Sequence, residues 1–240
     1  TGSYNITQVA WATAFRSIGN AKNNYASENY ENFLAYREVM AQRLQDRYEG
    51  LRYPTYGFMA EENAALAGKL YDPANGMVDK RSGDVMIPAF LAAYTGRDVN
   101  KISTNPFLGL LNILPNWRVT YDGLSRIPWV KKHFKSINLT HAYNCKYSIG
   151  GYTSFSTWVA ADGADKSLGF IRDVQTNNPI PSSPYDIATV SLTEQFSPLI
   201  GLNMTMKNSM TAKVEYRKQR NLALNVTSAQ LVEGGTEEFV

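Results

Sequence analysis

The stretch that decides the fold is residues 188–206, which read ATVSLTEQFSPLIGLNMTM. Apolar side chains occupy its even-numbered positions from Ala188 to Met206, and Glu194 is the exception. Polar or small side chains occupy the odd-numbered positions, apart from Leu199. An alternation with a period of two predicts a β-strand that has one apolar face and one polar face.

The residues that follow repeat the pattern and predict a hairpin. Residues 210–226 alternate again, and residues 207–209 supply a short turn between the two runs. Each run keeps its phase for about 19 residues, or roughly 60 Å, whereas strands of soluble domains rarely exceed about 10 residues. Large outer-membrane barrels extend their strands beyond the bilayer. The length favours a transmembrane barrel, and a long-stranded soluble sandwich or adhesin is the alternative.

Two more alternating runs precede this hairpin. Residues 116–122 form a short one, and residues 137–149 form a longer one in which His141 is the only polar member of the apolar face. The pair Gly150-Gly151 predicts a bulge after the second run. Residues 116–240 are therefore predicted to be antiparallel barrel strands, with a long loop at about 160–186 and the short turn at 207–209.

The first part of the chain has the periodicity of helices. Ser27 can cap a helix over residues 27–49, in which apolar residues follow the i, i+3, i+4 spacing of one face. Weaker helices are predicted at about 58–71 and 84–95. Residues 1–18 are a candidate barrel strand, and residues 19–115 are predicted to be an insertion that contains the three helices.

Composition narrows the classes of function. The 240 residues include 24 Lys and Arg against 21 Asp and Glu, a formal charge of +3 that does not favour a nucleic-acid partner. Cys145 is the single cysteine, so the chain forms no internal disulfide. The sequence has no run of 18 apolar residues that would predict a transmembrane helix. Because it opens at Thr1 without a signal-peptide pattern, we expect it to be an excerpt of a longer chain.

The residues that carry enzyme chemistry are scarce. His141 and Cys145 share a strand face but are four positions apart, about 13 Å, which is too far to ligate one ion. Residues 67–70 (AGKL) resemble the end of a phosphate loop, but the required Ser or Thr is Leu70. The sequence therefore predicts that the chain is not an enzyme, with no catalytic, cofactor-binding or metal-ligating residue and no cofactor.

Two charges and three aromatic residues have positions that call for an explanation. Lys218 and Arg220 fall on the apolar phase of the last long run, where a charge at mid-bilayer would cost about 2–4 kcal/mol. We expect them beyond the hydrocarbon layer or against another protein surface. Trp117, Trp129 and Tyr216 are candidates for an aromatic girdle.

Several stretches resemble one family closely. They are residues 87–98 (IPAFLAAYTGRD), 114–126 (LPNWRVTYDGLSR), 134–143 (FKSINLTHAY), 197–208 (SPLIGLNMTMKN) and 215–224 (EYRKQRNLAL). Together they resemble the SprA family, also called Sov, which is the outer-membrane translocon of the type IX secretion system of Bacteroidota. The resemblance covers most of residues 84–232 in linear order and is looser over residues 1–83.

The resemblance implies a mainly β fold: a segment of a very large transmembrane antiparallel β-barrel, with a helix-containing insertion outside the membrane. It implies that the chain is part of a protein-conducting channel of the outer membrane that exports folded proteins. In some relatives the channel also serves gliding motility. The implied partners are the lipid bilayer, the remainder of the same barrel chain, secreted proteins with a C-terminal type IX signal, and PorV-like shuttle and plug proteins. A soluble or surface-attached β-rich binding protein or adhesin without a pore is the alternative.

Overall fold

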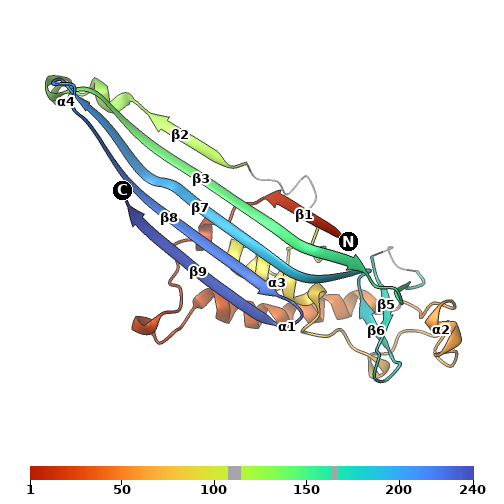
Figure 1. The fold of residues 1–240 in the computed structure, drawn as a ribbon. Coiled ribbons are helices and arrows are strands. Elements are labelled where there is room, and N and C mark those ends of the chain that lie inside the picture. The colour runs from red at the N-terminus through yellow and green to blue at the C-terminus, as the bar shows by residue number, and fades with distance from the viewer. Residues whose placement is uncertain (108–114, 164–166) are drawn as a thin grey trace.

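The chain forms one long antiparallel sheet with a helical layer over part of one face (Figure 1). The computed structural model describes residues 1–107, 115–163 and 167–240; residues 108–114 and 164–166, within the expected insertion and long loop, lie outside the described residues. The sheet is built on β3 (Phe134–Ser154), β7 (Tyr185–Met206), β8 (Thr211–Asn225) and β9 (Gln230–Phe239), in that order. A mainly β, antiparallel fold is therefore confirmed, and the described sheet is open at both edges.

The hairpin between β7 and β8 has the predicted short turn. The Met206 N–H donates to the Met210 carbonyl at 2.8 Å, and Ser209 adopts a positive φ of 68°. Pairing across the hairpin keeps one register from Thr205 opposite Thr211 to Ile200 opposite Tyr216. It shifts between Phe196 and Ile200, where β7 has a bulge.

One position in the sheet is filled by two separate segments. β1 (Gly2–Thr7) and β2 (Trp117–Tyr121) both pair with β3, and both run antiparallel to it. Thr7 lies opposite Lys146 and Trp117 lies opposite Tyr143, so β2 continues the line of β1. The two segments therefore form one interrupted strand, and the chain between them is an insertion.

The junction of the two segments is closed by hydrogen bonds to Cys145. The Gln8 N–H donates to the Cys145 carbonyl at 3.1 Å, and the Cys145 N–H donates to Asn116 Oδ1 at 2.9 Å. The candidate strand over residues 1–18 was too long, because β1 ends at Thr7 and the 3₁₀ helix η1 (Trp11–Thr13) follows. The insertion consequently begins at residue 8 rather than at residue 19.

The insertion supplies a helical layer, consisting of α1 (Glu28–Tyr48), α3 (Gly83–Thr95) and η1. Figure 1 shows this layer across one end of the sheet, while the end that carries α4 (Pro128–His133) projects beyond it. α1 starts where its Ser27 hydroxyl accepts a hydrogen bond from the Tyr30 N–H at 3.4 Å. α3 is buried from Val85 to Thr95 because it lies between α1 and the sheet.

The helical layer covers part of the apolar face of β7. Val190, Leu192 and Phe196 are buried there in a core shared with α1 and α3. Farther along the same face, Ile200 is 58% exposed. Alternation shows which residues share a face, but it does not show which distant helix packs on them.

Two other expected elements differ in the structure. The predicted helix at 58–71 is reduced to α2 (Phe58–Glu61), because the chain enters turns after Glu62 and Gly68 adopts a φ of +74°. The expected loop at about 160–186 instead contains most of a second sheet. Its strands are β4 (Val159–Ala160), β5 (Gly169–Arg172) and β6 (Pro179–Ser182).

An aromatic cluster fixes the second sheet to the helical layer. Phe170 of β5 lies 4.9 Å from the ring of Tyr53, 5.5 Å from Tyr48 and 5.7 Å from Tyr71. The Tyr48 hydroxyl donates to the Gly169 carbonyl at 2.9 Å, so the polar end of this buried ring is satisfied. Segments more than a hundred positions apart are joined in this way.

Residues 1–240 expressed alone are expected to aggregate rather than to form a stable soluble monomer. The outer edge of β9 and the exposed apolar side chains around Ile200 would both face water. Size-exclusion chromatography and thermal unfolding in detergent-free buffer check this expectation. A monodisperse monomer with a sharp, reversible transition would contradict it.

Candidate functional site

The helical layer divides the apolar face of the sheet into two halves. The covered half lies against α1, α3 and η1, and the uncovered half extends from the bulge in β7 to α4. Four side chains form a row across the uncovered half, one from each neighbouring strand. They are Tyr121, Leu139, Leu202 and Val214, which are register partners in sequence from β2 to β8.

This row belongs to a larger exposed apolar surface, which we call the apolar band. Val119, Ile200 and Phe239 lie on the same face, and Val119 and Ile200 are 54% and 58% exposed. Such a contiguous apolar surface is typical of a site that contacts another protein or a membrane. The apolar band is therefore the first candidate functional surface.

The length of the uncovered half matches a membrane-crossing strand. On β3 it spans residues 134–142, about nine residues, of which Ile137 is buried, and a transmembrane β-strand needs about 9–11. On β7 it spans residues 199–206, beyond the bulge. Each strand then continues into the covered half, beyond the residues that match the length of a membrane-crossing strand.

The opposite face of the sheet is polar along its whole length. Glu215, on this face of β8, accepts hydrogen bonds from Lys213 Nζ at 2.7 Å and from Arg217 Nη2 at 2.5 Å. On β7 the same face carries uncharged polar side chains such as Gln195 and Asn203. The sheet thus has one face that is polar over its full length and one that is mainly apolar.

A buried ion pair marks the middle of the covered half. Glu194 and Arg220 are register partners on β7 and β8, their Oε2 and Nη2 atoms are 2.9 Å apart, and their side chains are only 1% and 3% exposed. The Tyr143 hydroxyl donates to Glu194 Oε1 at 2.6 Å. The exception in the apolar run of β7 is therefore explained by a partner on the next strand.

Arg220 also joins the sheet to the helical layer. Its guanidinium donates to the carbonyls of Thr13 at 3.0 Å, Ala10 at 3.2 Å and Tyr94 at 3.4 Å. The Thr13 hydroxyl donates to the same Tyr94 carbonyl. One arginine thus satisfies backbone oxygens at η1 and at the end of α3, where a helix leaves carbonyls unpaired.

Lys218 and Arg220, the two basic residues on the apolar phase, both lie against other parts of the protein, which is the second of the two positions expected for them. Arg220 is buried beneath η1 and α3. Lys218 pairs with Glu237 at 2.5 Å, and its Nζ lies 5.4 Å from the centre of the Phe15 ring. Neither residue belongs to the uncovered half.

The three aromatic candidates lie toward the ends of the uncovered half. Trp117 stacks on Tyr143 with ring centres 4.4 Å apart, and Tyr216 stacks on Phe239 at 4.6 Å. Both pairs are near the border with the covered half. Trp129 is 64% exposed on α4, at the other end.

His141, Cys145 and Lys69, which the sequence analysis considered, each lie in a different part of the structure. His141 Nδ1 lies 2.7 Å from the Leu199 carbonyl, and Cys145 is buried in the core. Lys69 is exposed in a series of turns. Among the described residues, no three His, Cys, Asp or Glu side chains lie together in a way that could hold a metal ion. No helix in the described part of the chain is long and apolar enough to cross a membrane.

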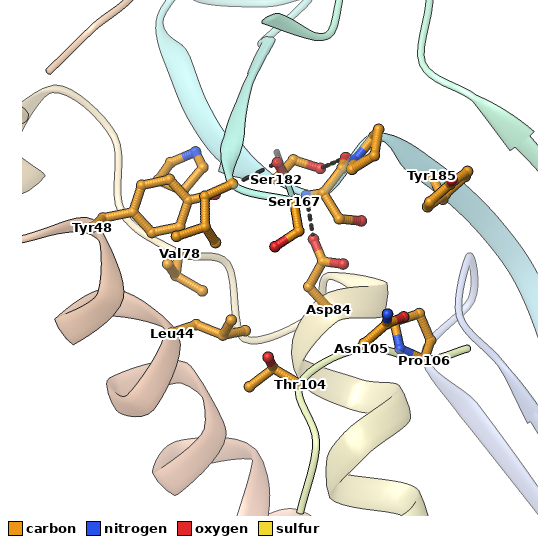
Figure 2. Close-up of a pocket in the computed structure, with 14 residues that line it drawn as sticks. Leu44, Tyr48, Val78, Asp84, Thr104, Asn105, Pro106, Ser167, Ser182 and Tyr185 are labelled. Carbon is orange, nitrogen blue, oxygen red and sulfur yellow. Dashed lines mark hydrogen bonds between the residues drawn. The ribbon is translucent and has the colours of Figure 1, made fainter. Parts of the chain in front are cut away.

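A cavity of about 330 Å³ lies in the insertion, between α1, the start of α3 and the second sheet (Figure 2). Asp84 of α3 faces it, and its Oδ2 accepts a hydrogen bond from the Ser183 N–H at 2.8 Å. Burial raises the pKa of this carboxyl. The sequence analysis did not single out Asp84, because an acidic residue in the first turn of a helix is common.

Comparison of the sequence with models of known families and with curated proteins finds no match.

Removal of one partner of the buried ion pair is expected to loosen the helical layer. Arg220→Met leaves Glu194 buried without a counter-charge, which typically costs about 3–5 kcal/mol. Amide hydrogen exchange of α3 and η1 should then accelerate about 100-fold or more in the full-length protein. Glu194→Met combined with Arg220→Met should recover much of the loss.

Lys218→Met is the matched control, because it removes a basic residue two positions away whose partner Glu237 is exposed. We expect it to cost about 1 kcal/mol or less. Equal acceleration of exchange in Lys218→Met and Arg220→Met would contradict the structural role assigned to Arg220.

Asp84 is expected to lower stability at neutral pH. Its folded-state pKa is raised above 3.8 by burial, so ionisation in the folded state is costly. This cost is absent below pH 3.8 and grows as the pH rises toward the raised pKa. Asp84→Asn keeps an acceptor for the Ser183 N–H, so its melting temperature should exceed that of the wild type at pH 7 and approach it at about pH 3.5. A difference that grows on acidification would contradict this sign.

Proposed function

We propose that this chain is a section of the wall of a transmembrane β-barrel in the outer membrane. The apolar band is the observation that supports the proposal: side chains of four strands are exposed on one face over about the length that crosses a bilayer. In this proposal the apolar band contacts lipid, and the polar face lines a water-filled interior. The covered half and its helical layer stand outside the hydrocarbon layer.

The two open edges of the sheet fit the same proposal. The outer edge of β9 and the edge formed by β1 and β2 have no further partner strand among the described residues. In lipid each unpaired backbone group costs several kcal/mol, so spanning sheets are closed barrels. Neighbouring strands of the same barrel, supplied by the remainder of the chain, would pair with both edges.

The particular function that we propose is protein export through this barrel, in type IX secretion. It rests on the resemblance to the SprA/Sov family together with the polar face. A wall lined by Asn, Thr, Gln and paired charges is hydrated and forms hydrogen bonds along the path of a substrate. Transport of this kind requires no covalent catalysis. The proposed partners are secreted proteins with a C-terminal type IX signal and PorV-like shuttle and plug proteins, without nucleic acid or cofactor.

A surface-attached β-rich binding protein without a pore is the second candidate. The observation that favours it is the helical layer, which covers part of the apolar face in the manner of an ordinary two-layer domain. Carbonate washing of membranes separates the two candidates. A barrel wall stays in the membrane fraction, whereas an adhesin without an anchor is released.

Adjacent substitutions on β7 test which face contacts lipid. Leu202→Arg places a charge in the apolar band and is expected to cost about 2–4 kcal/mol, with loss of assembled barrel. Asn203→Arg is the matched control, because it adds the same side chain one position away on the polar face. Heat-modifiable mobility and protease resistance of the full-length protein in outer-membrane fractions measure the outcome. Equal loss of assembly in both variants would contradict the membrane-strand proposal.

A further inference from the structure

The cavity in the insertion has the size and lining of a ligand site. Its volume of about 330 Å³ lies within the range of small-molecule sites. α1, α3, the loop before residue 107, the second sheet and the start of β7 all contribute to its walls (Figure 2). Because five segments converge on it, the cavity is a product of the tertiary fold rather than a surface irregularity.

Most of the wall is apolar and stiff. Leu44 and Tyr48 of α1 form one side, and both are buried. Pro181 and Pro184 form another side, where the proline rings restrict the backbone that shapes the cavity. Tyr48 is held in place by its hydrogen bond to the Gly169 carbonyl. Such walls suit an unbranched hydrocarbon stem.

Among the described residues that line the cavity, Asp84 is the one that carries a charge. Its Oδ2 accepts the Ser183 N–H, and the described residues include no basic side chain in an ion pair with it. Arg81 is exposed and lines a neighbouring cavity. A carboxylate in apolar surroundings is stabilised by a cation that enters the same surroundings.

We propose that this cavity binds a cationic head group on an apolar stem, either the side chain of a lysine in a partner polypeptide or a free alkylamine. The ammonium group pairs with Asp84, and the methylene stem lies against Leu44, Pro181 and Pro184. The Ser182 hydroxyl also lines the cavity and donates to the Ser183 carbonyl at 2.9 Å, so its oxygen can accept another ammonium proton.

Other ligand classes fit the cavity less well. A hard divalent cation takes six or more oxygen ligands, commonly with several carboxylates, whereas this cavity offers one carboxylate. A purely apolar ligand would seal Asp84 from water without a counter-charge, which is costly. An anionic ligand would be repelled by it. The cavity and the carboxylate of Asp84, the one that its described lining offers, therefore favour a monocation with a hydrocarbon stem.

The test uses three probes on the full-length protein in detergent at pH 7.5. They are a blocked Gly-Lys-Gly peptide, the same peptide with norleucine in place of lysine, and pentylamine. Isothermal titration calorimetry should detect saturable binding of at least one cationic probe with a Kd of about 10 mM or tighter, and norleucine peptide binding at least about 10-fold weaker. Binding of pentylamine alone would identify a free amine as the ligand, and binding of the lysine peptide would identify a polypeptide.

Asp84→Asn should weaken binding of the cationic probe about 10-fold or more, since it removes the negative charge that pairs with the ammonium group. Asp186→Asn is the matched control, because Asp186 is exposed and does not line this cavity. Saturable binding of the lysine and norleucine peptides with equal affinity, no saturable binding of either cation, or equal weakening by the two substitutions would overturn the proposal. The comparison of the two peptides needs no variant.

Discussion

The ion pair between Glu194 and Arg220 is the constraint on which the arrangement of the sheet depends. Two charges on an otherwise apolar face are stable only where protein, rather than lipid, covers them. η1 and the end of α3 supply that cover, because their carbonyls accept hydrogen bonds from Arg220 Nη1 and Nη2. The pair thus fixes the place at which η1 and the end of α3 contact the sheet.

The interrupted strand explains how the helical layer reaches this position. The chain leaves the sheet after β1 and returns at β2, on the same edge of β3 and a few residues farther along. The two ends of the insertion are therefore close together at this edge, and the helices between them pack on one face of the sheet. Since the apolar side chains around Leu192 lie on that face, burial of α3 against them provides the driving force.

Three different surfaces result from this single fold. The apolar band is presented by strands alone, the polar face extends over the full sheet, and the cavity with Asp84 is formed only where the insertion meets the second sheet. In a membrane-embedded wall these surfaces would face lipid, the interior of the barrel and an aqueous compartment, respectively. The cavity would therefore remain accessible to a ligand from solution.

The sequence by itself determined the local features of this protein. Alternation identified the faces of β7 and β8 and the turn after Met206, and helical spacing located α1 and α3. The apolar phase of Lys218 and Arg220 indicated positions beyond the hydrocarbon layer or against another protein surface. These features are local, because they depend on residues a few positions apart.

Only the tertiary structure decided which residues meet. Arg220 contacts Thr13 across 207 positions, β2 continues β1 across the insertion, and the expected long loop became a sheet that closes the cavity over Asp84. Periodicity within one segment does not predict such contacts. The free energy that selects them comes from burial shared between distant segments, not from the structural preference of any one segment.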